Sequence, residues 1–268
     1  MATVLEPNKT KIAKRVFEIF EFFCDKPGQK ATVMDIVRRY GRPQSSTSEL
    51  LSSLVEMGLL YKDPRSRSYT PTPRIAALGT SAQPEIIRDG GLFTLMDRLA
   101  EQTGKSVALF GMVGTHVQVF RLSTGIEPIA HKVAYGASEQ ISASTAGLLL
   151  LSTFAPDQAA RMLWRLNAEA EADDKFDLCE LKERVAAFRR QGHAVGNAGF
   201  APGVHVAATL LPRSSIRRPL ALGVIYPECI DADTGALIAT MNLGIAKCAA
   251  PQTGNYYVPA AKLYKIAV

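Results

Sequence analysis

The side chains with the clearest chemical use lie on one face of a helix expected to start at Pro43 and to stop at Gly58. That face, opposite the apolar stripe, carries Gln44, Ser45, Ser48, Glu49, Ser52 and Ser53. A helix that meets only water usually carries more Lys and Glu on its outer face. Small hydroxyl and amide groups let a helix come close to the floor of a groove, and they can hydrogen-bond base edges or phosphates. The pattern therefore favours a nucleic-acid contact.

Cationic side chains gather a few residues further along, in a turn between two expected strands. The strands are Leu59–Tyr61 and Arg67–Thr70, and the turn between them reads KDPRS. Lys62, Arg65 and Arg67 place three positive charges at or beside the tip of this hairpin. Lys and Arg neutralise phosphates and release counterions, which supplies much of the affinity for DNA. The hairpin is therefore a second candidate contact.

Two helices are expected before the polar helix, and they would position it. The first covers Lys9–Asp25 and ends at the Lys26-Pro27-Gly28 sequence. Its apolar residues at helical spacing are Ile12, Val16, Ile19, Phe20 and Phe23. For the second, Thr32 is the expected N-cap, with Asp35 as an imperfect capping-box partner. Gly41 suits the left-handed turn at its end, and Pro43 suits the first position of the third helix.

The order helix, helix, short turn, polar helix and basic hairpin is that of a winged helix-turn-helix. The candidate DNA contacts are Thr32, Arg42, Gln44, Ser45, Ser46, Ser48, Glu49, Ser52, Lys62, Arg65 and Arg67. Within this set, Gln44 has an amide able to read adenine. Glu49 is repelled by DNA unless it accepts from a cytosine amino group or pairs with Arg42 or a neighbouring Arg. The alternative for this unit is a small three-helix core that binds a protein.

The distribution of charge supports the same interpretation. The net charge of the chain is +6. Residues 1–80 hold 13 Lys and Arg against 8 Asp and Glu, whereas residues 81–268 hold 18 against 17. Nearly all the positive excess therefore lies in the first third of the chain, as expected for a nucleic-acid-binding unit beside a neutral domain.

The remaining reactive residues form no recognisable catalytic or metal-binding set. The four cysteines and four histidines are dispersed, without a CxxC pair or the ligand spacing of a zinc site. The cysteines are expected to be buried free thiols in a reducing compartment. A phosphate-binding glycine loop and a nucleophile elbow are also missing. We therefore expect no catalytic residues, no metal and no cofactor.

After residue 91 the pattern changes to that of a second, α+β domain. An amphipathic helix is expected over Leu92–Thr103, followed by strands at Ser106–Val113, His116–Leu122 and Glu127–Tyr135. Further helices are expected from near Ser142, from Pro156, over Asp177–Gln191 and over Asp231–Ala249. The remaining strands are expected at His193–Val195, Val204–Leu211 and Leu220–Tyr226. A mixed antiparallel sheet flanked by helices follows from this order.

The helix expected near Ser142 begins with small and hydroxyl residues. Ser142, Ser144 and Thr145 stand where unpaired backbone N–H groups and the helix dipole favour a carboxylate. Ala143, Ala146 and Gly147 leave space for a ligand to approach. Ordinary N-capping by Ser142 or Ser144 explains the same residues, and the two roles are compatible.

These stretches together resemble the IclR family of bacterial transcription regulators. In the first unit the resemblance lies in TVMDIVRRYGRPQSSTSELLSSLVEMGLL and YKDPRSRSYTPTPRIAALG. In the second it lies in LAEQTGKSVAL, SASTAG, RVAAFRRQGHAV and PGVHVAATLLP, and it reaches about residue 250. It implies a linker helix that helps to pair two subunits, and a GAF-like domain that holds a small effector, often an aromatic or short organic acid.

The sequence departs from the family pattern at the implied effector pocket. Gly196–Phe200 replaces an acidic run, and Val206 replaces a polar or Cys position. The implied effector contacts are Ser142, Ser144, Thr145, Ala146, Asn197, His205 and Val206. With Asn197 and His205 as its polar groups, such a pocket would suit an aromatic or weakly polar ligand.

The leading hypothesis is a cytoplasmic regulator that binds double-stranded operator DNA as a homodimer or a dimer of dimers, under control of a small-molecule effector. Its expected parts are a DNA-binding domain (1–78), a linker (79–91), an effector-binding domain (92–250) and a C-terminal tail (251–268). One alternative is a constitutive DNA-binding repressor with a degenerate, ligand-free sensor. Another is an enzyme that uses His193 or His205 as a base. No membrane span is expected, because no apolar run approaches the necessary length of about 20 residues.

Overall fold

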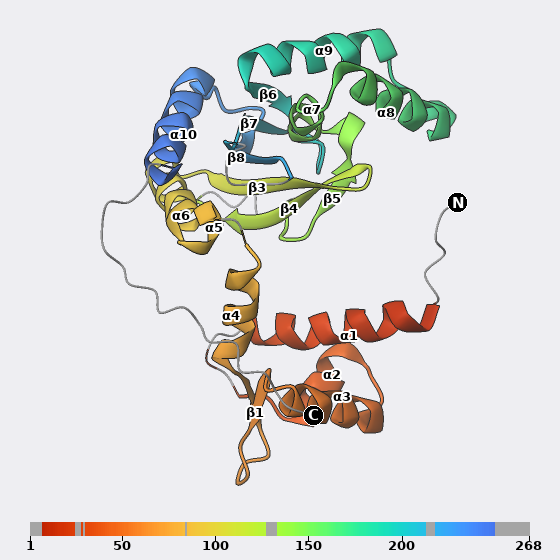
Figure 1. Ribbon diagram of the computed structural model, residues 1–268, viewed down its shortest axis with the longest axis vertical. Helices are drawn as coiled ribbons and strands as arrows, with labels where there is room; N and C mark the ends of the chain where they lie inside the picture. Colours follow the sequence, from red (N-terminus) through yellow and green to blue (C-terminus); the bar gives the residue numbers. More distant parts are fainter. Residues whose placement is uncertain are drawn as a thin grey trace. The chain divides into compact units, whose positions relative to one another are not determined.

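The computed structural model describes residues 7–24, 28, 30–83, 85–126, 133–212 and 218–249 (Figure 1). The chain divides into two compact units, Met1–Gln83 and Pro84–Val268. Each unit is described by itself below. Within the described ranges, no helix is long and apolar enough to cross a membrane.

The first unit is a helical core with a hairpin attached. Its elements are α1 (Pro7–Cys24), α2 (Val33–Tyr40), α3 (Gln44–Glu56), β1 (Leu60–Lys62), β2 (Tyr69–Pro71) and α4 (Pro73–Ser81). Its core is formed by Ile19, Phe23, Ala31, Ile36, Leu51, Leu54, Leu60 and Tyr69. The expected helix-helix-helix-hairpin order is confirmed. Ile12, which was expected in the apolar stripe of α1, is exposed instead. Of the expected stop at Lys26-Pro27-Gly28, the first two residues lie outside the described residues.

The ends of α2 and α3 follow from local sequence. Thr32 and Asp35 form a full capping box, because each side chain bonds the other residue's backbone N–H. Gly41 closes α2 in the left-handed conformation with φ 62° and donates its N–H to the Val37 carbonyl. Pro43 is the extended N-cap of α3, so it stands one position earlier than expected.

The hairpin is antiparallel and slightly shifted from the expected strands. Leu60 pairs with Pro71 and Lys62 with Tyr69. Ala31 adds a bridge to Tyr69, with N–O distances of 3.1 and 2.7 Å in the two directions. Because Tyr69 is also buried in the core, this bridge fixes the base of the hairpin to the segment before α2.

The second unit is built on a six-stranded sheet of order β5-β4-β3-β8-β7-β6. The strands are β3 (Ser106–Val113), β4 (His116–Ser123), β5 (Ser138–Gln140), β6 (His193–Asn197), β7 (Val204–Leu210) and β8 (Leu220–Pro227). Every pairing between these strands is antiparallel, so the sheet is not mixed. The α+β class is confirmed.

Helices cover both faces of this sheet (Figure 1). The helices are α5 (Glu85–Arg88), α6 (Gly91–Thr103), α7 (Thr145–Leu151), α8 (Pro156–Glu169), α9 (Leu178–Gln191) and α10 (Thr234–Ala249), with short 3-10 turns η1 (Ile141–Ala143) and η2 (Ala172–Asp174). One core lies between the sheet and α7, α8 and α9. The other lies between the opposite face and α5, α6 and α10.

Two expectations for the second unit need correction. The strand expected over Glu127–Tyr135 falls largely outside the described residues, but its end at Tyr135 lies in a turn, and Ser138–Gln140 forms the edge strand instead. The cysteines are free, but Cys24, Cys179 and Cys229 are exposed and only Cys248 is partly covered. The tail 251–268 lies outside the described residues.

Gly147 controls how closely α7 packs against the turn before it. A Cβ atom at this position would lie 2.6 Å from the Ile141 carbonyl oxygen and 2.8 Å from the Ile141 Cα. Both neighbours are backbone atoms and cannot rotate away. The buried helix α7 can therefore start where it does only with a glycine in its first turn.

We expect Gly147→Ala to lower the free energy of unfolding of the second unit by about 1–3 kcal/mol, because overpacking here must move backbone. Urea denaturation followed by circular dichroism measures the change. Gly235→Ala in α10 is the matched control, since its Cβ would meet only the Asp233 carboxylate oxygen at 3.4 Å. Equal stability of the two variants would contradict this account.

Candidate functional site

The polar face of α3 is open to solvent in the described structure. Gln44, Ser45, Glu49 and Ser52 are exposed, and Ser48 is half-buried. The opposite face is closed, because Thr47, Leu51 and Leu54 are buried. Packing therefore separates the two faces as the sequence predicted, and it leaves the amide and hydroxyl groups available to a partner.

Arg42 is held in the turn between α2 and α3 by Glu18 of α1. Its Nη2 and Nε atoms donate to the two Glu18 carboxylate oxygens at 2.7 and 3.3 Å. The Glu18 residue is only 9% exposed, and its hydrogen bond and charge raise the pKa of Arg42. The pairing of Arg42 with Glu49 considered from the sequence is therefore not the one formed. Arg42 fixes α1 to the turn, and Glu49 faces solvent.

A second contact from α1 reaches the start of α3. Arg15 donates from Nη2 to the Ser46 hydroxyl oxygen at 3.0 Å. Ser46 is turned toward α1 and is only partly exposed, which distinguishes it from Ser45. Arg15 was not singled out in the sequence, because helical spacing along α1 identifies the apolar face and says little about the position of a single cation.

Thr32 is occupied by its capping role. Its hydroxyl donates to Asp35 Oδ2 at 2.7 Å, and its backbone N–H donates to the same oxygen at 2.8 Å. Thr32 therefore acts first as the start of α2, and a DNA contact from it would compete with these bonds.

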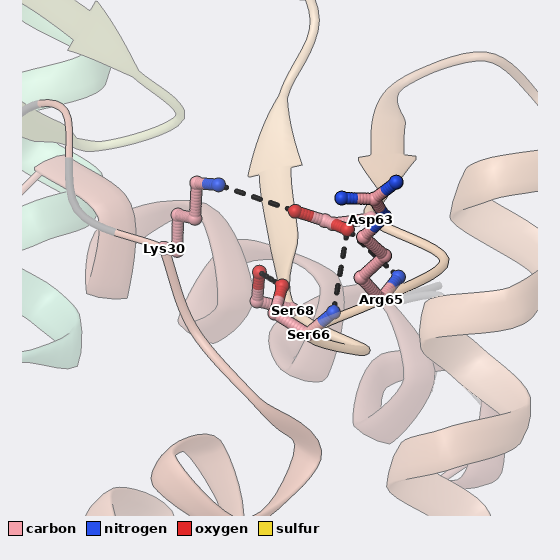
Figure 2. Close-up of polar contacts among 5 residues, drawn as sticks. All are labelled: Lys30, Asp63, Arg65, Ser66 and Ser68. Carbon is pink, nitrogen blue, oxygen red and sulfur yellow. Dashed lines mark hydrogen bonds and ion pairs between the residues drawn. The ribbon is translucent and has the colours of Figure 1, made fainter.

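The turn at the tip of the hairpin is organised by Asp63 (Figure 2). Its Oδ1 accepts from the backbone N–H groups of Arg65 at 2.9 Å and Ser66 at 3.3 Å, and its Oδ2 accepts from Lys30 at 3.2 Å. These bonds, the one from Arg65 first, lower the pKa of Asp63 to about 2. The carboxylate thus shapes a loop whose other charged groups are cations.

The three expected cations of the hairpin are exposed. Lys62 lies over the Tyr69 ring, 5.6 Å from the ring centroid. Arg67 adopts φ 53°, and it is the one residue other than glycine with positive φ in the described chain. An L-residue in this region costs about 1–2 kcal/mol. The hairpin thus carries this strain at a residue whose cationic side chain is exposed.

In the second unit the expected effector residues divide into two groups. Ser144, Thr145, Ala146 and Val206 are buried on the α7 side of the sheet. Ser144 is the N-cap of α7 and accepts from the Gly147 N–H at 3.4 Å, so the capping role is confirmed. Ser142, in η1, is half-buried and donates to the Gln140 side-chain oxygen at 3.4 Å.

Asn197 and His205 lie on the other face of the sheet. Successive strand residues point to opposite faces, and directly paired residues share a face. Val206 faces α7, so His205 and its partner Asn197 face the side of α6 and α10. His205 contacts the Tyr226 ring and lies 3.6 Å from Glu228, and Asn197 accepts from the Gly199 N–H. His205 therefore does not lie beside Ser144, which corrects the sequence expectation for that residue. The Asn197 side chain is bonded to Gly199, whose backbone packs on Ser144.

Arg184 of α9 is a polar residue that reaches the start of α7. Its Nη2 lies 3.4 Å from the Thr145 hydroxyl. A Cβ at Gly196 would lie 2.8 Å from that hydroxyl and 3.8 Å from Arg184 Nη2, so the missing side chain leaves the guanidinium room. Sequence reasoning missed Arg184, because it stands among five other charged residues of a surface helix.

The fold and the two candidate sites together define a winged helix-turn-helix followed by an α+β domain. Residues 13–64 match the IclR helix-turn-helix domain. The chain is also similar to the HTH-type transcriptional regulator TsaQ1/TsaQ2 of Comamonas testosteroni, with 30% identity over 86 residues. That match covers 32% of this chain and 31% of the relative.

Solved structures resemble the chain over most of its length. The Thermotoga maritima IclR is 15% identical, with TM-score 0.59, covering 89% of this chain and 97% of the other. An IclR homologue from Microbacterium hydrocarbonoxydans, solved with 4-hydroxybenzoate, is 18% identical, with TM-score 0.61, covering 88% and 98%. At these identities the structures support the fold. The domain match shows an IclR helix-turn-helix domain over residues 13–64.

We expect Arg67→Gly to raise the free energy of unfolding of the first unit by about 1 kcal/mol, because glycine adopts positive φ without strain. The same change should weaken binding to duplex DNA, since it removes a cation. Arg67→Lys keeps both the charge and the backbone strain. Arg67→Asn removes the charge and reduces the strain, because asparagine adopts positive φ more readily. Thermal unfolding and fluorescence anisotropy measure the two effects. A less stable Arg67→Gly variant would contradict the strain.

The Asp63 carboxyl should titrate near 2 in a pH series followed by NMR, against an ordinary value of 3.8. Because the folded-state pKa is lowered, its contribution to the turn is complete above about 3.8 and is lost as the pH falls toward 2. Asp63→Ala should speed hydrogen exchange of the Arg65 and Ser66 amides, whereas Asp63→Asn keeps an acceptor and should change them less. An unshifted titration would refute the assigned bonds.

Proposed function

We propose that the protein is a transcription regulator that binds operator DNA through its first unit and a small effector through its second. The observation that carries the proposal is the open polar face of α3, which lies within the segment 13–64 that matches the IclR helix-turn-helix domain. A basic hairpin follows this helix in the chain. An open face of short amides and hydroxyls suits the major groove, where base edges present donors and acceptors. The relative TsaQ1/TsaQ2 carries the same description of a transcriptional regulator.

The side chains divide into base-reading and phosphate-binding groups in this proposal. Gln44, Ser45, Ser48 and Ser52 read base edges from α3, with Glu49 accepting from a cytosine amino group. Lys62, Arg65 and Arg67 bind phosphates from the hairpin. Thr32, Arg42 and Ser46 act mainly by holding the unit together, since each has a partner within it.

A second copy of the chain fits the surface of the first unit. No residue of α4 is buried, although Ile75 and Leu78 are apolar. Ile12 and Phe17 of α1 are also exposed, at 58% and 66%. A homodimer, or a dimer of dimers, would cover such surfaces and would place two α3 helices in major grooves about 34 Å apart. The proposal assigns DNA binding to residues 1–78, a linker to 79–91, effector binding to 92–250 and a C-terminal tail to 251–268.

The effector site proposed for the second unit lies around η1 and the start of α7. Its residues are Ser142, Ser144, Thr145, Ala146 and Val206, with Arg184 added. An aromatic or weakly polar compound suits this largely apolar region, and a relative of the same fold was solved with 4-hydroxybenzoate. The constitutive repressor with a ligand-free sensor is the second candidate. It is favoured by the burial of Ser144, Thr145, Ala146 and Val206.

Selection of binding sites from a random pool of DNA duplexes tests the DNA-binding proposal. We expect an inverted repeat whose half-sites are one helical turn apart. On the selected duplex, Gln44→Ala should cost about 1–3 kcal/mol and relax the preference at one base pair. Arg65→Ala should weaken binding to all duplexes and reduce the slope of log affinity against log salt by about one.

Lys182→Ala is the control, because Lys182 is an exposed cation of the second unit. It should change neither affinity nor salt dependence. Failure to enrich any duplex at low salt, by protein shown to be folded, would refute DNA binding and leave the protein-binding alternative for this unit.

A further inference from the structure

Phe200 packs its ring against the middle of the sheet in the second unit. The ring stacks on that of Phe110, with centroids 5.9 Å apart and planes 20° from parallel. Phe110 is fully buried on β3, and Phe200 is partly buried in the same core. Phe200 itself belongs to the loop between Asn197 and Val204, so the stack joins a loop to a strand.

This ring lies among the buried residues of the proposed effector site. At the neighbouring Gly199, a Cβ would come within 2.7 Å of the Ala143 carbonyl oxygen and 3.1 Å of the Ser144 Cα. The loop therefore runs directly against the junction of η1 and α7. Phe110 and Val206 stand side by side on the sheet, because a Cβ at Gly223 would meet both, at 2.9 and 2.7 Å.

The loop is attached to the sheet at both of its ends. The Ala198 N–H donates to the Val204 carbonyl at 2.8 Å, and the Glu228 N–H donates to the Gly203 carbonyl at 2.9 Å. Gly199, with φ 89°, stands between the first attachment and Phe200. Movement of the Phe200 ring away from Phe110 would leave both of these attachments in place.

We propose that Phe200 is the internal occupant of the effector site, and that an aromatic effector binds by displacing its ring from Phe110. The proposal rests on the proposed function, because it assumes that the second unit binds an effector. An aromatic ring is the favoured ligand class, since Phe110 already presents its face to a near-parallel ring. An aliphatic ring of equal volume fills the space but forms no such stack.

Displacement has a measurable consequence for affinity. When the binding-competent state is only a fraction of the population, the apparent dissociation constant rises by the inverse of that fraction. Removing the Phe200 ring removes this competition. We therefore expect Phe200→Ala to bind toluene and benzoate at least tenfold more tightly than the unaltered protein, and to prefer benzoate to cyclohexanecarboxylate.

Titration calorimetry on the full chain measures these affinities, with Phe176→Ala as the matched control. Phe176 is a partly buried phenylalanine of the same core, and it lies in the segment before α9. A gain of affinity in both variants would mean that any cavity in this core binds the probes, and it would overturn the proposal. Phe200→Leu provides a second variant, with a smaller expected gain, if the alanine variant does not fold.

NMR on the unaltered protein tests displacement directly. Contacts between the Phe110 and Phe200 rings should weaken as toluene is added, and contacts from toluene to Phe110 should replace them. Toluene bound with the ring contacts intact would overturn the proposal. So would a lack of toluene binding by the unaltered protein, by Phe200→Ala and by Phe200→Leu.

Anisotropy with the selected duplex separates this proposal from the proposed function. Loss of the ring contacts in a protein that binds no DNA would leave Phe200 as the occupant and refute the regulator. Normal DNA binding with no gain of affinity for toluene or benzoate in Phe200→Ala would support the regulator and refute Phe200 as the occupant of the effector site.

Discussion

The first unit depends on the ion pair between Glu18 and Arg42. A carboxylate that is almost removed from water must be paired, because an uncompensated buried charge is strongly destabilising. The two hydrogen bonds from the Arg42 guanidinium supply that pairing, and they also fix the turn before α3 against α1. The orientation of the polar face therefore follows from a contact between segments 24 residues apart in sequence. Replacing Arg42 alone would leave the Glu18 carboxylate unpaired in this poorly solvated position, whereas the Arg42 side chain is 38% exposed.

Local sequence predicted the elements of this unit well, because their ends depend on neighbouring residues. The capping box of Thr32 and Asp35, the left-handed Gly41 and the two faces of α3 all follow from spacing within a few positions. Partners distant in sequence were not predictable in this way. Several carboxylates and cations stand at comparable helical positions, and only the fold decides that Arg42 meets Glu18 while Glu49 remains free for solvent.

In the second unit the strands were largely predicted, but the composition of the candidate site was not. The interpretation placed Asn197 and His205 with Val206 because they are near in sequence or in the expected strands. Alternation along β7 sends His205 to the opposite face, and the register with β6 takes Asn197 with it. Arg184 comes from a helix 39 residues after Thr145. Register and helix packing therefore decide which groups surround the start of α7.

The short, neutral side chains on α3 have a consequence for how this protein could change over evolutionary time. If the hairpin cations supply most of the attraction to DNA, then Gln44, Ser45 and Ser52 mainly choose the site, and each adds a smaller part of the affinity. Each of these residues is exposed and stands outside the core. Exchanges among them would redirect the protein to different promoters at little cost to folding. A gene copy could in this way acquire new targets through a few substitutions on one helix, while the rest of the molecule stays as it is.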